Sequence, residues 1–246
     1  MPEGDTIHRI AASLAPRLTG KALERVTTQG LARDVAGQTV MHVAAHGKHL
    51  VIELDSGAYL RAHLGMNGRF RAYNRAGGEA MLAKLWIGAP TIEISHRRHP
   101  RHGMAMATLG PDVLAGDFDG RIAAARAAEQ GARSIADILL DQRIVAGIGN
   151  IYKCEALFVA GIDPRTRVGQ LDAATLEEIY AGARRLMRAK LGPAGSRPAP
   201  SFLVYSRTGK PCTRCGTPIS CYMFGDPARW TWSCATCQPA PARSGQ

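Results

Sequence analysis

Four of the six cysteines form two close pairs near the C-terminal end of this 246-residue sequence. Cys212 and Cys215 make the first pair, Cys234 and Cys237 make the second, and 18 residues separate the two pairs. Two CxxC pairs at this spacing predict a tetrahedral zinc site, because each tight turn presents two thiolates on one side. A disulfide framework is the alternative, but it is typical of short secreted proteins. Four thiolates fill the coordination shell, so we expect one structural Zn²⁺ without an open catalytic position.

The net charge indicates the class of partner. Lys and Arg total 31 against 20 Asp and Glu, which gives a formal charge of +11 and a pI near 9.8. Such an excess of cations favours a polyanionic partner, most commonly a nucleic acid. With 46% hydrophobic and 21% charged residues, the composition is that of a globular chain. No apolar run approaches the ~18 residues of a membrane helix, and the N-terminus is polar, so we expect neither a membrane span nor secretory export.

Helical and alternating patterns both occur in the first part of the sequence. Apolar residues at spacings of three and four predict an amphipathic helix over Thr6–Leu18, which ends before Gly20. Alternating apolar residues predict three strands, over Gln38–Ala45, His49–Leu54 and Ala58–Leu64. Gly47 and Lys48 lie between the first two strands, so we expect them to form a hairpin tip.

Helices dominate the second part, from about residue 117 to residue 191. Ser134 and Asp137 resemble a capping box, and an apolar face predicts a helix over Asp172–Lys190. A glycine-rich turn at 145–150 opens onto a further helix. Prolines and glycines make 192–200 a linker. The predicted divisions are a domain at 1–116, a helical domain with its linker at 117–200, the cysteine module at 201–238 and a loose tail at 239–246.

Two places in the second part could bind phosphate, and each has a plainer interpretation. Backbone amides at Gly147, Gly149 and Asn150 open a helix and could receive an anion, although such glycines are more often simple turn residues. The cysteine module and tail carry five cations against one acid, which either attracts a phosphate backbone or forms a solvated face. These charged residues are Arg207, Lys210, Arg214, Arg229 and Arg243 against Asp226.

The N-terminus carries a candidate nucleophile. Removal of Met1 would leave Pro2 with a secondary amine, and an α-amino group with a pKa of ~7.7–8.0 is partly neutral and nucleophilic near pH 7. Glu3 beside it is a possible proton donor, and Lys48 could reach in from the hairpin tip. Taken alone, these are three ordinary residues.

Together, the motifs resemble those of the formamidopyrimidine-DNA glycosylase and endonuclease VIII family. They are Pro2-Glu-Gly-Asp-Thr-Ile-His-Arg9, Gly47-Lys48, His63-Leu-Gly-Met-Asn-Gly68, Leu140-Asp-Gln-Arg-Ile-Val-Ala-Gly-Ile-Gly-Asn-Ile-Tyr152 and the four-cysteine finger. Their order and spacing match the family as far as Gln238, and the Pro-Glu-Gly start is closer to the endonuclease VIII branch. The resemblance implies an α+β fold, with an N-terminal β-sandwich domain that carries an N-terminal helix. A C-terminal helical domain would hold a helix–two-turn–helix motif and a zinc-finger β-hairpin.

The resemblance also implies a reaction. The family removes oxidised bases, here with pyrimidines favoured, and then cuts the strand by β/δ-elimination as an AP lyase of base excision repair. Pro2 would attack the sugar C1′ and form a Schiff base, with Glu3 as the acid and base of base loss. Lys48 would assist base removal and β-elimination. Arg229, five residues before Cys234, would bind phosphate and assist δ-elimination.

Three further residues would hold the DNA by the same resemblance. Gly149 and Asn150 would contact the backbone beside the lesion. Met66 would enter the duplex where the damaged nucleotide leaves, because a base must be flipped out before its glycosidic bond is reachable. The expected partner is damaged double-stranded DNA, and the protein is expected to be a cytoplasmic, nucleoid-associated monomer.

The sequence departs from the family pattern at two places, which leaves other functions open. Thr6 stands where the family often has an acid, and the family's void-filling Arg-Phe pair is not recognisable; the basic, histidine-rich stretch 95–103 lies in that neighbourhood. These departures motivate an alternative, a catalytically impaired member that only binds damaged DNA. A zinc-finger protein that binds RNA or ribosomes is a third possibility, but it leaves the N-terminal motif unexplained.

Overall fold

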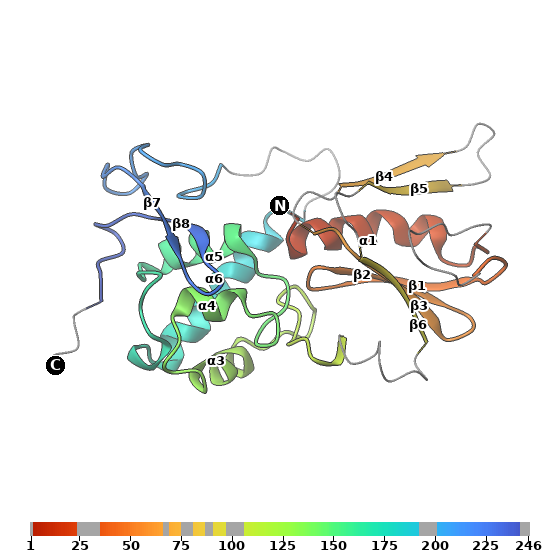
Figure 1. Ribbon diagram of the computed structural model, residues 1–246, viewed down its shortest axis with the longest axis horizontal. Coiled ribbons are helices and arrows are strands. Elements are labelled where there is room, and N and C mark those ends of the chain that lie inside the picture. The colour runs from red at the N-terminus through yellow and green to blue at the C-terminus, as the bar shows by residue number, and fades with distance from the viewer. Residues whose placement is uncertain are drawn as a thin grey trace. The chain divides into compact units, whose positions relative to one another are not determined.

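The computed structural model describes residues 2–23, 35–65, 69–74, 81–86, 91–96, 106–191 and 201–241. The chain divides into two compact units, Met1–Leu109 and Gly110–Gln246, whose elements are labelled in Figure 1. The predicted linker at 192–200 and residues 242–246 of the predicted tail lie outside the described residues. Each unit has its own hydrophobic core, and each is therefore described by itself.

Unit 1 begins with helix α1, Gly4–Leu18. Ile7, Ala11 and Leu14 recur at helical spacing and are buried, because α1 packs this face against strands β1 (Val40–His46) and β2 (His49–Leu54). The helix starts two residues before the predicted Thr6. The reason is that the Glu3 carbonyl accepts the amides of Thr6 (3.0 Å) and Ile7 (3.2 Å), which extends the first turn.

The strands of unit 1 form two antiparallel sheets. The larger sheet has the order β1-β2-β3-β6, with β3 at Ala58–His63 and β6 at Thr91–His96. The smaller sheet pairs β4, Arg69–Asn74, with β5, Met81–Trp86. His46 pairs with His49, which confirms the predicted two-residue tip at Gly47 and Lys48. β1 starts later than predicted, because the amide of Thr39 donates to Asp55 Oδ2 (3.0 Å).

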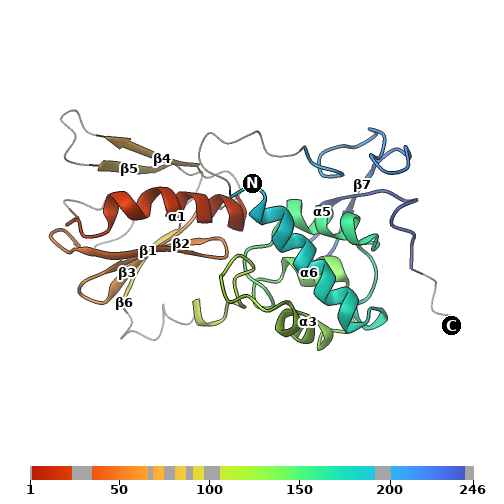
Figure 2. The same cartoon turned by 180° about the vertical axis from the view of Figure 1, so that it is seen from behind.

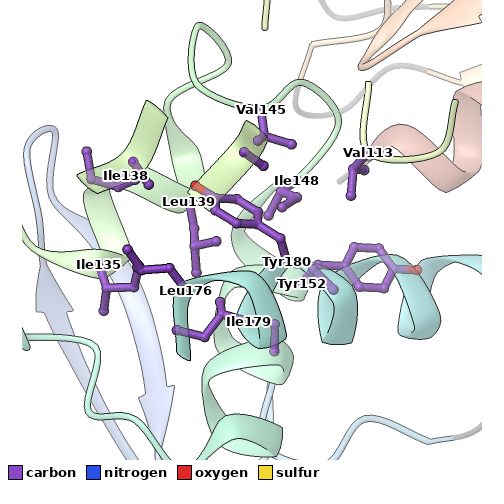
Figure 3. Close-up of a cluster of buried hydrophobic side chains, with 14 of the residues drawn as sticks. Val113, Ile135, Ile138, Leu139, Val145, Ile148, Tyr152, Leu176, Ile179 and Tyr180 are labelled. Carbon is purple, nitrogen blue, oxygen red and sulfur yellow. The ribbon is translucent and has the colours of Figure 1, made fainter. Parts of the chain in front are cut away.

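The helices of unit 2 surround a large apolar core. Its helices are α3 (Gly120–Ala128), α4 (Ile135–Leu140), α5 (Asn150–Ala160), the 3₁₀ turn η1 (Val168–Gln170) and α6 (Ala173–Arg188). Ser134 and Asp172 cap α4 and α6 by accepting the amides of Asp137 and Thr175, so both predicted helix starts are confirmed. Figure 3 shows Tyr152 and Tyr180 among the aliphatic side chains of the core.

The finger hairpin belongs to unit 2. Strand β7, Ser220–Phe224, pairs with β8, Arg229–Ser233, and β8 packs against α5. Figures 1 and 2 show these strands beside α5. A small apolar cluster joins the two elements, because Cys154 and Phe158 of α5 are buried together with Val204, Ile219 and Cys234. At the hairpin tip, the amide of Asp226 donates to Asp137 Oδ1 of α4 (3.0 Å).

Candidate active site and nucleic-acid interface

Two of the candidate catalytic residues lie at the start of α1. Pro2 precedes Glu3, the N-cap residue, whose backbone is extended (φ −119°, ψ −174°). The Glu3 side chain forms no capping hydrogen bond within the described chain, yet it is 1% exposed. Its carboxyl group therefore does not serve to cap the helix. It is held out of water at the N-terminus of the helix.

The third candidate catalytic residue, Lys48, lies at the β1–β2 tip, beside two histidines. His49 and His63 face each other across β2 and β3, with ring centroids 4.9 Å apart. Burial, together with the neighbouring charged groups of His63 and Arg61, lowers the pKa of His49 to about 3. The pKa of His63 is also lowered, first by burial and then by Lys48 and Arg61. Both rings are therefore neutral near pH 7, and the charge of Lys48 contributes to lowering the pKa of each.

His63 also fixes the backbone that follows β3. Its Nδ1 accepts the amide of Gly65 (3.1 Å), and Gly65 adopts the left-handed region (φ 60°) that suits glycine. The sequence analysis did not single out His49 or His63. Two signals were available, because His49 directly follows Lys48 and His63 lies shortly before Met66, the residue predicted to enter the duplex. Met66 itself lies outside the described residues, as do residues 97–105 of the basic stretch.

The start of α5 brings together the candidates of unit 2. Gly149 is the N-cap residue and Asn150 the first residue of the helix. Asn150 is 8% exposed, and its Nδ2 donates to the carbonyl of Trp230 (2.9 Å), which follows Arg229 in β8. The structure thus places Asn150 against the strand that begins with the exposed Arg229.

Some groups that the sequence offered for phosphate are used inside the protein. The amide of Gly147 donates to Gln142 Oε1 (3.0 Å), so it is not directed at an anion. Arg214 donates to the carbonyls of Phe158 (2.9 Å) and Val159 (3.1 Å) at the C-terminal end of α5. This cation therefore stabilises the last turn of a helix, where the dipole favours positive charge.

A residue that sequence reasoning missed lies under the start of α5. Lys153 is 1% exposed, and its Nζ donates to Asn150 Oδ1 and to Thr231 Oγ1, both at 2.8 Å. The sequence contained one signal for this contact: Lys153 follows Asn150 by three positions, and residues at this spacing lie on the same helix face.

The four finger cysteines come together as the spacing predicted. Their Sγ atoms all lie within 4.8 Å of one another, with Cys212 and Cys237 at 3.8 Å and Cys215 and Cys234 at 3.4 Å. Four sulfurs bound tetrahedrally to Zn²⁺ at about 2.3 Å are roughly 3.8 Å apart, so the arrangement fits such an ion. The cluster could therefore hold a metal ion.

The units place the predicted residues in two groups. Pro2, Glu3 and Lys48 belong to unit 1, whereas Asn150, Arg229 and the cysteines belong to unit 2. In the described residues no helix has both the length and the apolar character needed to cross a membrane.

Comparison with known proteins gives a consistent result for both units. Residues 1–102 match the family model described as the formamidopyrimidine-DNA glycosylase N-terminal domain, and residues 109–197 match the formamidopyrimidine-DNA glycosylase H2TH domain. The chain is 33% identical to a probable endonuclease 8 2 of Streptomyces coelicolor, over 98% of this chain and 95% of that protein. It is 34% identical to the DNA-(apurinic or apyrimidinic site) lyase Nei2 of Mycolicibacterium smegmatis, over 98% of this chain and 100% of that protein.

A solved structure supports the same comparison. The crystal structure of the MutM (Fpg) protein from Thermus thermophilus superposes with a TM-score of 0.80 at 27% sequence identity, over 96% of this chain and 98% of that chain. The similarity therefore extends over both units, with their antiparallel sheets and helices.

Proposed function

Because the chain belongs to the formamidopyrimidine-DNA glycosylase and endonuclease VIII family, we propose that it is a bifunctional DNA glycosylase and AP lyase of base excision repair. The observation that carries this proposal is the match to both family domains, together with near full-length similarity to a relative named as an AP lyase. The substrate is damaged double-stranded DNA, from which the enzyme removes oxidised bases, pyrimidines favoured.

The proposed chemistry begins at the N-terminal amine. With Met1 removed, the Pro2 nitrogen donates its lone pair to C1′, and the glycosidic bond breaks with its electrons leaving on the base. Glu3 supplies the proton exchange that accompanies base loss and sugar-ring opening, and its burial at the start of α1 supports this role. The resulting iminium draws electrons from C2′, so loss of a C2′ proton expels the 3′ phosphate. Hydrolysis of the iminium then returns the free amine.

Residues in both units hold the DNA in this proposal. Lys48 contacts phosphate and assists β-elimination, and the lowered pKa values of the neighbouring His49 and His63 leave these two rings uncharged. Gly149 and Asn150 contact the backbone beside the lesion, and Arg229 contacts phosphate and assists δ-elimination. Met66 fills the space that the flipped nucleotide leaves. The hydrogen bond between Asn150 and the strand of Arg229 supports a shared role for these two residues.

We propose one structural Zn²⁺ on Cys212, Cys215, Cys234 and Cys237. The mutual distances of the four sulfurs support a tetrahedral site, and four thiolates leave no position for substrate. When bound, the ion supplies a rigid base for the finger hairpin. The finer fold belongs to the same proposal: the two sheets of unit 1 form a β-sandwich, and unit 2 contains a helix–two-turn–helix motif. The division into 1–116, 117–200, 201–238 and a tail at 239–246 is retained as a functional division.

Covalent trapping tests the proposal. The protein is incubated with duplex DNA that contains an oxidised pyrimidine, in the presence of borohydride, which reduces an iminium to a stable amine. We expect a trapped protein–DNA complex and a nicked strand. The matched control carries two extra N-terminal residues, which convert the Pro2 nitrogen into an amide and should abolish trapping. Absence of a complex with protein whose intact mass shows Met1 removed would falsify the lyase assignment.

The non-enzymatic alternative predicts a different result. A protein that only binds damaged DNA would shift the duplex in a gel without a trapped complex or a nick. The near full-length similarity to an AP lyase disfavours this alternative, and intact mass gives a rapid check, because a retained Met1 leaves Pro2 unable to attack.

A further inference from the structure

Lys153 is a buried lysine between α5 and the finger hairpin. Its side chain is 1% exposed, and its ammonium group donates to Asn150 Oδ1 and Thr231 Oγ1, each at 2.8 Å. Thr231 is itself fully buried, and its hydroxyl donates to the carbonyl of Arg229 (3.1 Å). A continuous chain of hydrogen bonds therefore runs from the first residue of α5 to the first residue of β8.

The position of Lys153 is costly for a residue whose only role is stability. Removing an ammonium group from water carries a desolvation penalty of several kcal/mol. A cation one turn from a helix N-terminus is also disfavoured by the helix dipole. An apolar side chain of similar volume would fill the same space without either cost. A buried polar group that contacts both Asn150 and Thr231 therefore points to a role in organising these neighbours.

Lys153 determines how the Asn150 amide is oriented. An ammonium group can only donate, so the atom of Asn150 that faces it must be the oxygen Oδ1. The Nδ2 group then faces the carbonyl of Trp230, which can only accept. If Lys153 were apolar, the buried oxygen would lose a charge-assisted hydrogen bond, and the contact with the Trp230 carbonyl alone would hold the amide in place.

The same ammonium group constrains the backbone of Arg229 through Thr231. Because the Thr231 hydroxyl accepts from Lys153, its single proton is directed to the Arg229 carbonyl. Residues far apart in sequence, by 78 positions for Lys153 and Thr231, are thus held in a fixed relation.

We propose that Lys153 is a positioning residue that sets Asn150 and Arg229 relative to each other, so that both engage one DNA backbone. The inference rests on the proposed function of these two residues. Lys153 acts through its neighbours and does not itself contact DNA. A loss of Lys153 is therefore expected to change how tightly abasic DNA is held and how efficiently δ-elimination follows β-elimination.

The test substitutes Lys153→Met in the full chain and measures two quantities. One is the Kd for a duplex with a stable, unreactive abasic-site analogue, and the other is the ratio of δ- to β-elimination products from a natural abasic site. We expect Kd to rise about tenfold, and the δ/β ratio to fall by a similar factor, as for loss of one charge-assisted hydrogen bond. The matched control is Lys190→Met, which removes the same charge elsewhere in unit 2, where Lys190 lies over the Phe202 ring.

Further variants distinguish a failure of the proposed roles of Asn150 and Arg229 from a failure of the positioning role of Lys153. Asn150→Ala and Arg229→Ala should each weaken binding or lower the δ/β ratio; if neither does, the proposed function of those residues fails. If both do, but folded Lys153→Met behaves like Lys190→Met, the positioning role is overturned. Should Lys153→Met fail to fold, Thr231→Val decides, because it removes the hydroxyl at nearly constant volume. A lowered δ/β ratio in that variant supports the proposal, and an unchanged ratio overturns it.

Discussion

The start of α1 in unit 1 and the start of α5 in unit 2 are similar in backbone and different in side chains. Both N-cap residues, Glu3 and Gly149, are extended and form no side-chain capping bond in the described chain. Helices α3, α4 and α6 instead have the N-cap residues Asp119, Ser134 and Asp172, whose side chains accept amides of the first turn. The contrast separates helix starts built for stability from helix starts that carry the proposed functional residues.

The two uncapped starts differ in what surrounds them. At the start of α1 the carboxyl group of Glu3 is buried and directly follows Pro2 in the chain, an arrangement suited to proton transfer. At α5 a buried ammonium group orients Asn150 and ties it to the finger strand, an arrangement suited to holding a ligand in place. The comparison therefore predicts that substitutions at α1 change the chemistry, that substitutions around α5 change binding, and that substitutions at capped starts change only stability.

The largest expected effect is that of Glu3→Gln. Because Glu3 is the proposed acid and base of base loss, we expect excision of an oxidised base to slow by at least about 100-fold. The helix should remain, since the side chain does not cap α1, so circular dichroism should be unchanged. Single-turnover excision on a duplex substrate gives the rate, and binding to an abasic-site analogue serves as the control. A tenfold loss of binding with normal excision would contradict the assignment of proton transfer to the start of α1.

Metal removal should act mainly at the α5 end. The proposed Zn²⁺ would brace a hairpin whose apolar cluster includes Phe158 of α5 and Cys234, so a strong chelator should loosen the finger and weaken its proposed phosphate contacts. We expect affinity for the abasic-site analogue to fall at least about tenfold, with recovery on adding Zn²⁺. The core of unit 1 should be unaffected, and this can be followed by hydrogen exchange of β1–β3. If hydrogen exchange accelerated equally in both units, the expectation that metal removal affects mainly the α5 end of unit 2 would be wrong.

A smaller effect concerns pH and the histidine pair beside Lys48. The pKa of His49 is lowered to about 3, first by burial and then by neighbouring cationic groups, against 6.5 when unfolded. Below pH 6.5 the unfolded chain binds the extra proton, so unit 1 should lose stability as pH falls from 6.5 towards 3. The slope is at most about 1.4 kcal/mol per pH unit, and less because the ring is only partly buried.

The variant His49→Phe measures this contribution. Nδ1 of His49 is buried without a hydrogen-bond partner in the described residues, so an apolar ring of similar shape should be tolerated. Urea unfolding at pH 7.5 and pH 5.5 should show a smaller pH dependence for His49→Phe than for the unsubstituted protein. Equal pH dependence in the two proteins would assign the acid sensitivity to other groups.

Short-range features were predictable from the sequence because neighbouring residues determine them. The Gly47-Lys48 tip, the caps at Ser134 and Asp172 and the two CxxC turns each depend on residues within a few positions of one another. The family motifs then indicated the function, which similarity over both units supports.

Features that depend on packing between distant segments could not be predicted in this way. Asn150 meets Trp230 across 80 sequence positions, and no local pattern specifies that contact. Arg214 is a second example. In the sequence it is one of five cations in the cysteine module and tail, whereas in the structure it donates to carbonyls at the C-terminal end of α5. Charge and spacing show which groups are available, and only the packing shows whether a group is turned inward or outward.

The smallest expected effect on function is at a capped helix start. Asp172 accepts the amide of Thr175 (2.7 Å) at the start of α6, so Asp172→Ala removes one helix cap and should lower the melting temperature by about 3 °C. Excision rate and DNA affinity should stay within twofold of the parent, in contrast to Glu3→Gln. Asp172→Asn, which keeps a capping oxygen, is the matched control. If Asp172→Ala impaired excision as strongly as Glu3→Gln, the difference between capped and uncapped helix starts would carry no functional meaning.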